Sequence, residues 1–107
     1  MKDGIYFVEF KSNIQDFGVG TVIVKDGVVN GGDYGFTYRG KLENNLLKLN
    51  AKQHDKDVVS VFGNISDYEL VLEVNPTNAG YDLVGKTELA PGVVIKVQAK
   101  FIGDLLV

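Results

Sequence analysis

The sequence has 107 residues, of which 45% are hydrophobic and 23% charged, with a formal net charge of −3 and no cysteine. This length and composition predict one globular domain over residues 1–107 with a single core. Without thiols there are no disulfides, thiolate metal ligands or cysteine nucleophiles. The negative charge and the lack of any run of Lys or Arg argue against direct binding of nucleic acid.

The lack of any run of Lys or Arg also argues against binding to an anionic membrane surface. No apolar stretch approaches the roughly 20 residues that span a bilayer. The start, Met1–Gly4, lacks the layout of a signal peptide. The absence of cysteine mildly favours a reducing compartment. We therefore expect a cytoplasmic protein.

The first strand is predicted over Gly4–Lys11, because apolar residues recur there at every second position. Tyr6, Val8 and Phe10 share one face of it. Ile5 and Phe7 share the other face. We therefore expect this strand to be covered on both faces over part of its length.

Turn residues divide the chain into short segments. Asp26-Gly27, between the strand-like runs 21–25 and 28–30, suits a two-residue hairpin because both positions tolerate positive φ. Further turns are predicted at Asn30–Asp33, Glu43–Asn45, Thr77–Gly80 and Pro91–Gly92.

Three later strands are predicted over 46–52, 68–74 and 93–101, where apolar and polar residues alternate. The acids Glu9, Glu69 and Glu73 are expected to face outward. Between these strands, residues 53–67 are the weakest stretch. Their polar start predicts an exposed loop, and 58–62 fits a short strand or a helical turn equally well.

Seven or eight strands with a turn about every ten residues favour an antiparallel meander. We predict an all-β fold with one sheet curled into a barrel, because closure removes unpaired edges. Periodicity alone leaves a sandwich open. Glycines within or beside the strand patterns are expected at bulges and bends; they are Gly18, Gly20, Gly35, Gly40 and Gly85.

The residues offer no catalytic set. His54 is the single histidine, and together with Asp55 and Asp57 it fits a solvated loop better than a metal site. Two glycine groups, 18–20 and 31–33, lack the following helix that a phosphate loop needs. We therefore predict no catalytic, cofactor-binding or metal site, and a protein that is not an enzyme.

Eleven aromatic residues suit a barrel interior, which either packs solidly or holds a small apolar ligand. We favour the solid core. The segment 101–107 is unusually apolar and either folds back on the barrel or forms a subunit contact. Leu105, Leu106 and Val107 are its predicted dimer-contact residues.

Eight short motifs follow one another along the chain in an order that is typical of a known family. They are Lys2-Asp3-Gly4-Ile5-Tyr6, Phe10-Lys11-Ser12-Asn13, Gly18-Val19-Gly20, Gly27, Gly31-Gly32-Asp33, Tyr38-Arg39-Gly40, Tyr68-Glu69-Leu70-Val71 and Ala99-Lys100-Phe101-Ile102. In this order and spacing the chain resembles the GrlR-like family. These are small bacterial negative regulators, named for a repressor of type III secretion gene transcription.

The resemblance implies an eight-stranded, lipocalin-like, up-and-down barrel, a homodimer and function by protein binding. The family's named member sequesters a transcriptional activator through an exposed acidic loop and does not act by binding DNA itself. Here the corresponding stretch, 41–46, is shorter and nearly neutral. Of the family's acidic loop only Glu43 is carried over, and the family's target is not. Glu43, Asn44 and Asn45 are the predicted partner-binding residues.

Two functions follow as hypotheses. The first is a non-enzymatic regulator that binds and sequesters a protein partner, with a transcriptional activator as one such partner. The alternative is a carrier that holds a small apolar ligand or lipid in the barrel interior.

Overall fold

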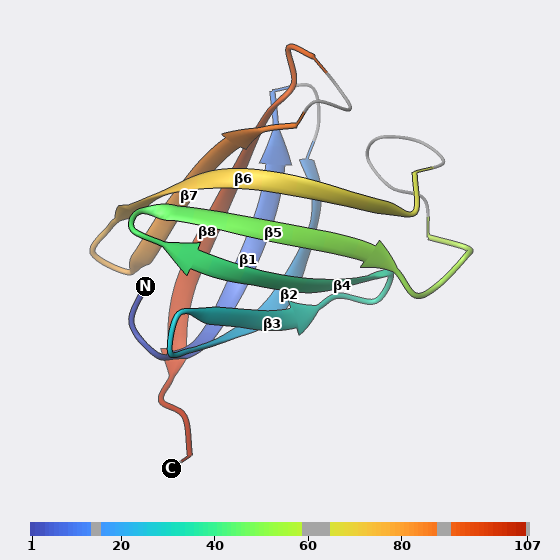
Figure 1. The fold of residues 1–107 in the computed structure, drawn as a ribbon. Helices are drawn as coiled ribbons and strands as arrows, with labels where there is room; N and C mark the ends of the chain where they lie inside the picture. The colour runs from blue at the N-terminus through green and yellow to red at the C-terminus, as the bar shows by residue number, and fades with distance from the viewer. Residues whose placement is uncertain (14–15, 59–64, 88–90, 107) are drawn as a thin grey trace.

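A computed structural model describes residues 1–13, 16–58, 65–87 and 91–106. The chain forms a closed barrel of eight antiparallel strands, each paired with the next along the sequence (Figure 1). The strands are β1 (Gly4–Ser12), β2 (Asp16–Lys25), β3 (Val28–Gly32), β4 (Phe36–Glu43), β5 (Leu46–Gln53), β6 (Asp67–Pro76), β7 (Gly80–Lys86) and β8 (Val94–Gly103). The predicted all-β, up-and-down barrel is confirmed, and the sandwich is wrong.

Pairing between β1 and β8 closes the sheet. Tyr6 lies opposite Phe101, and Ser12 lies opposite Ile95. The register shifts once, because Ile5 pairs with Gly103 and leaves Ile102 as an extra residue on β8. Such a bulge increases the local twist, which helps a small barrel to curl.

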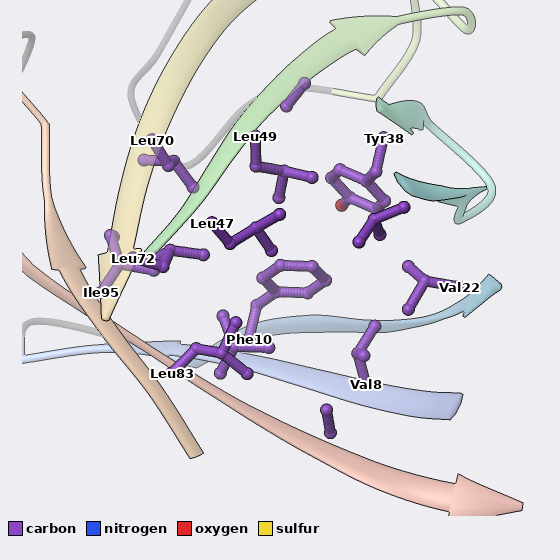
Figure 2. Close-up of a cluster of buried hydrophobic side chains, with 14 of the residues drawn as sticks. Val8, Phe10, Val22, Tyr38, Leu47, Leu49, Leu70, Leu72, Leu83 and Ile95 are labelled. Atoms are coloured by element: carbon purple, nitrogen blue, oxygen red, sulfur yellow. The ribbon is translucent and has the colours of Figure 1, made fainter. Parts of the chain in front are cut away.

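The interior is filled by one side chain from every second position of the strands. In β6, for example, the even-numbered residues from Tyr68 to Val74 are buried, whereas Glu69, Val71 and Glu73 are exposed. Figure 2 shows labelled side chains of β1, β2 and β4–β8 pointing toward one another. Phe10 and Tyr38 meet there, with ring centroids 5.0 Å apart. The alternation predicted from the sequence therefore decides which side chains form the core.

Local backbone geometry explains the β2–β3 hairpin. Asp26 and Gly27 have φ values of 52° and 77°, as a two-residue hairpin turn requires. The predicted Asp-Gly turn is confirmed.

The turn predicted at Asn30–Asp33 is wrong, because Asn30–Gly32 belongs to β3 and the chain turns only at 33–35. Gly31 lies where β3 packs closely against β2. A Cβ there would lie 2.1 Å from the Thr21 carbonyl oxygen. The sequence predicts a turn at this glycine, but in the structure its missing side chain allows the backbones of β2 and β3 to approach closely.

Another predicted glycine bend lies in β2. Gly18 has a φ of 131°, and the register between β1 and β2 shifts beside it. The stretch 53–67 contains the end of β5, a loop over 54–58 and the start of β6 at Asp67. Of 58–62, only Val58 is described, and it lies in a bend; 59–62 lie outside the described residues.

Candidate binding surfaces

The barrel interior leaves very little room. An apolar void of about 20 Å³ lies between Met1, Phe10, Leu72 and neighbouring core side chains. That is about the space of one water molecule, and an apolar lining keeps such a space dry. Among the described residues the interior is thus largely filled by side chains, which fits the solid core better than a ligand cavity.

Two polar tyrosines close the ends of the core. Tyr38 donates a hydrogen bond of 2.5 Å to Asp33 Oδ2, while Asp33 Oδ1 accepts from the backbone of Gly35 and Phe36. Burial, and then the bond to Asp33, raises the pKa of Tyr38. The phenol therefore stays neutral, and its partner shapes the β3–β4 turn.

Tyr6 occupies the opposite end of the barrel. Its hydroxyl donates to the Lys2 carbonyl oxygen at 2.6 Å, and the Lys2 backbone N–H donates to the Tyr81 hydroxyl at 3.0 Å. Burial, and then the nearby Tyr81 and Asp3, raises the pKa of Tyr6 to about 12. Tyr6 and Tyr38 thus both act as structural hydrogen-bond donors.

His54 lies exposed in the loop after β5, as predicted. Its Nε2 is 2.8 Å from the Asp33 carbonyl oxygen, so the tautomer with a proton on Nε2 donates there. Its backbone N–H donates to Gly35. The ring therefore ties two loops together. Across the described ranges, no three His, Asp or Glu side chains gather closely enough to hold a metal ion.

The predicted partner-binding residues lie together at the β4–β5 turn. Glu43 ends β4, and Asn44 and Asn45 form the turn, with an Asn44 φ of 57°. All three are exposed. Glu43 lies 3.7 Å from Lys48 Nζ. An ion pair exposed to this degree contributes little stability, so both side chains are available to a partner.

The predicted dimer-contact segment follows β8. Leu105 is half-buried and Leu106 fully exposed, and the segment runs away from the barrel in Figure 1. It does not fold back over the core. Val107 lies outside the described residues.

Sequence reasoning did not identify a surface that spans three neighbouring strands. It is an outer apolar patch made of Ile5 and Phe7 on β1, Val19 and Ile23 on β2, and Ile102 on β8. Ile5 pairs directly with Ile23, and the register sets Ile102 beside them. Val19, Ile23 and Ile102 are 45% to 53% exposed.

The sequence predicts that β1 is covered on both faces over part of its length, but no segment of the described part of the chain packs over its outer face. Ile5 and Phe7 are half-buried only. A surface groove of about 580 Å³ adjoins the patch, between Phe7, Lys100 and the turn 77–79. A cluster of exposed apolar side chains is typical of a protein interface. The sequence does contain a signal for this surface, because Ile5 and Phe7 make the second face of β1 apolar.

No family of known proteins matches this sequence, and no curated protein matches it either. The GrlR-like resemblance therefore stays a prediction.

Among the residues that the structure describes, no helix has the length and apolar character needed to cross a bilayer.

Proposed function

We propose that this protein is a non-enzymatic regulator of the GrlR-like kind, which acts in the cytoplasm by binding and sequestering a protein partner. The partner class that the resemblance implies is a transcriptional regulator. We also propose that the protein is a homodimer, with no direct role for nucleic acid or membrane.

The observation that supports the homodimer is the outer apolar patch, whereas the exposed turn 43–45 supports binding of a different protein. The side chains of the patch come from β8, β1 and β2 and face away from a core that is already filled. Removing apolar surface from water is favourable, by about 25 cal/mol for each Å² before the entropic costs of association are counted. Covering the patch with another protein surface would therefore be favourable.

The patch is continuous with the C-terminal segment that motivates the dimer. Ile102 borders Ile5 on one side and leads along the chain to Leu105 and Leu106 on the other. One self-complementary contact, repeated by a two-fold axis, would cover both. We assign the dimer to this face and leave the β4–β5 side for a different protein.

Light scattering tests this assignment. We expect twice the chain mass at micromolar concentration, and a monomer for Ile23→Glu, because a buried unpaired carboxylate opposes association. Val84→Glu is the matched control, since Val84 is an outward valine on β7 with 38% exposure. A wild-type monomer, or equal loss of the dimer in both variants, contradicts the assignment.

A pull-down from native lysate tests partner binding. Recovery of the bait alone contradicts the proposed regulator function.

The carrier function lacks a comparable observation. Ligand pockets commonly measure roughly 300–1,000 Å³, whereas the interior void is about 20 Å³. Denaturing extraction followed by mass spectrometry checks this directly. A stoichiometric apolar molecule released from the native protein would restore the carrier as the better explanation.

A further inference from the structure

One row of outward side chains crosses seven strands of the barrel without a single acid. The register pairs these residues successively from β2 to β8: Lys25, Val28, Lys41, Lys48, Val71, Lys86 and Val94. We call its first four members, Lys25, Val28, Lys41 and Lys48, the lysine–valine row. In a chain with a net charge of −3, such a local excess of cations is unexpected.

The lysine–valine row is open to solvent. Its three lysines are exposed, and Val28 is 38% exposed. Neighbouring strands lie about 4.8 Å apart, so the row extends over about 14 Å. Three of its members belong to β3, β4 and β5, the strands that pass in front of β8 and β1 in Figure 1.

The row carries positive charge that the described residues neutralise only in part. Lys48 has Glu43 at 3.7 Å, but within the described ranges Lys25 and Lys41 form no ion pair within 4.0 Å. Lys41 and Lys48 are direct cross-strand partners. Like charges in that position destabilise a sheet, so an anion placed between them would relieve the repulsion.

A shallow hollow adjoins this lysine pair. It measures about 360 Å³, and Arg39, Lys41 and Lys48 contribute its cations, with Asn50 as a further polar group. Glu43 and Glu69 line the hollow as well, so its cations exceed its acids by one. The hollow is large enough to take one or two side chains of a bound segment.

We propose that the lysine–valine row binds an acidic protein segment in which carboxylates alternate with apolar residues. This inference rests on the proposed function and names the chemistry of its partner. The carboxylates pair with Lys41, Lys48 and Lys25, while an apolar side chain covers Val28. The predicted partner-binding turn, 43–45, lies at the tip of the same hairpin and borders this surface.

An acidic protein segment fits the row better than a nucleic acid does. A phosphate backbone is neutralised by many cations, and the overall charge of −3 repels a long polyanion. Val28 between Lys25 and Lys41 matches an apolar side chain.

The test uses a labelled peptide of eight alternating Glu and Val residues and fluorescence anisotropy at 50 mM salt. We expect binding by the wild-type protein and about tenfold weaker binding by the Lys41→Gln/Lys48→Gln variant. The control variant is Lys11→Gln/Lys96→Gln, a second directly opposed lysine pair on β1 and β8. It makes the same change in net charge and should bind within about twofold of wild type. Circular dichroism checks that both variants are folded.

Three results overturn the inference: no binding of the peptide, equal loss in both double variants, or displacement of the peptide by an eight-nucleotide single strand as readily as by unlabelled peptide. Pull-downs with the same variants separate the two proposals. Undiminished capture of the wild-type partner by Lys41→Gln/Lys48→Gln removes the inference and leaves the regulator. Peptide binding without any captured protein removes the regulator and leaves the acidic-segment site.

Discussion

The two outer faces of the barrel share one core but differ in chemistry. Across β8, β1 and β2 the outward residues Ile102, Ile5 and Ile23 form an apolar patch. Across β2 to β5 the lysine–valine row sets three outward lysines beside one valine. In an eight-stranded closed barrel, β1 and β5 are four strands apart. The two surfaces adjoin on β2, where Ile23 and Lys25 lie two residues apart on the outer face, and they extend from there in opposite directions around the barrel.

The difference shows where functional information is stored in this fold. Inward positions are restricted to side chains that fill the core. Outward positions have no such restriction, so their chemistry is free to serve binding. Average composition hides this, because the net charge of −3 combines a cationic row with acids elsewhere.

The largest expected effect separates the shared core from the faces. Leu72 is 1% exposed and its neighbour Val71 is 48% exposed. Leu72→Ala should lower the free energy of unfolding by about 3 kcal/mol because it leaves a cavity. Val71→Ala should change it by about 0.5 kcal/mol. Urea denaturation measures both, and equal losses would mean that the wall is not divided into an inner and an outer face.

A smaller effect is the pH dependence of stability, which arises from one buried tyrosine behind each face. The pKa of Tyr6 on β1 is raised to about 12, and that of Tyr38 on β4 is also raised. An unfolded tyrosine ionises near pH 10. Between pH 10 and 12 the unfolded chain thus binds fewer protons than the native chain, and stability falls as pH rises. The stabilisation is complete below pH 10.

Urea midpoints at pH 8 to 11 test this dependence. We expect a decline that begins near pH 10 and becomes shallower in Tyr38→Phe. The same slope in both proteins would contradict the assignment to Tyr38.

The smallest effect distinguishes the faces by ionic strength. Salt screens exposed charges over about 8 Å at 0.15 M. Raising salt from 50 to 300 mM should weaken binding of the Glu-Val peptide several-fold and leave dimer dissociation nearly unchanged. Light scattering and anisotropy in the same buffers measure both. Parallel weakening would show that charge, and not the apolar patch, also holds the dimer.

Much of the fold follows from the sequence, because alternation is a local property. The predicted strands 68–74 and 93–101 lie within two residues of β6 and β8 at each boundary. Asp26-Gly27 was a reliable signal, since its backbone requirement is also local. Closure was not a local property: the pairing of Tyr6 with Phe101 joins opposite ends of the described chain.

The candidate surfaces were harder to predict. Glu43 could be placed on the outside from the sequence, because a turn is normally exposed. For the segment with Leu106 the sequence left two alternatives open, folding back on the barrel or a subunit contact. Lys25 and Lys48, by contrast, become members of one row only through three successive strand registers. A shift by one residue would turn either side chain to the opposite face, so no pattern within one strand contains the row.

The pairing of Ile5 with Gly103 also has a consequence for folding kinetics. Seven of the eight strand pairings are hairpins between sequence neighbours, whereas this one closes a loop of nearly the whole chain. The entropy of closing a loop grows with its length, and long-range pairing slows folding. A circular permutant that joins β8 to β1 by a short linker and opens the chain at Asn44 would convert the slow closure into a hairpin. The same barrel would then form with its long-range step moved to β4 and β5.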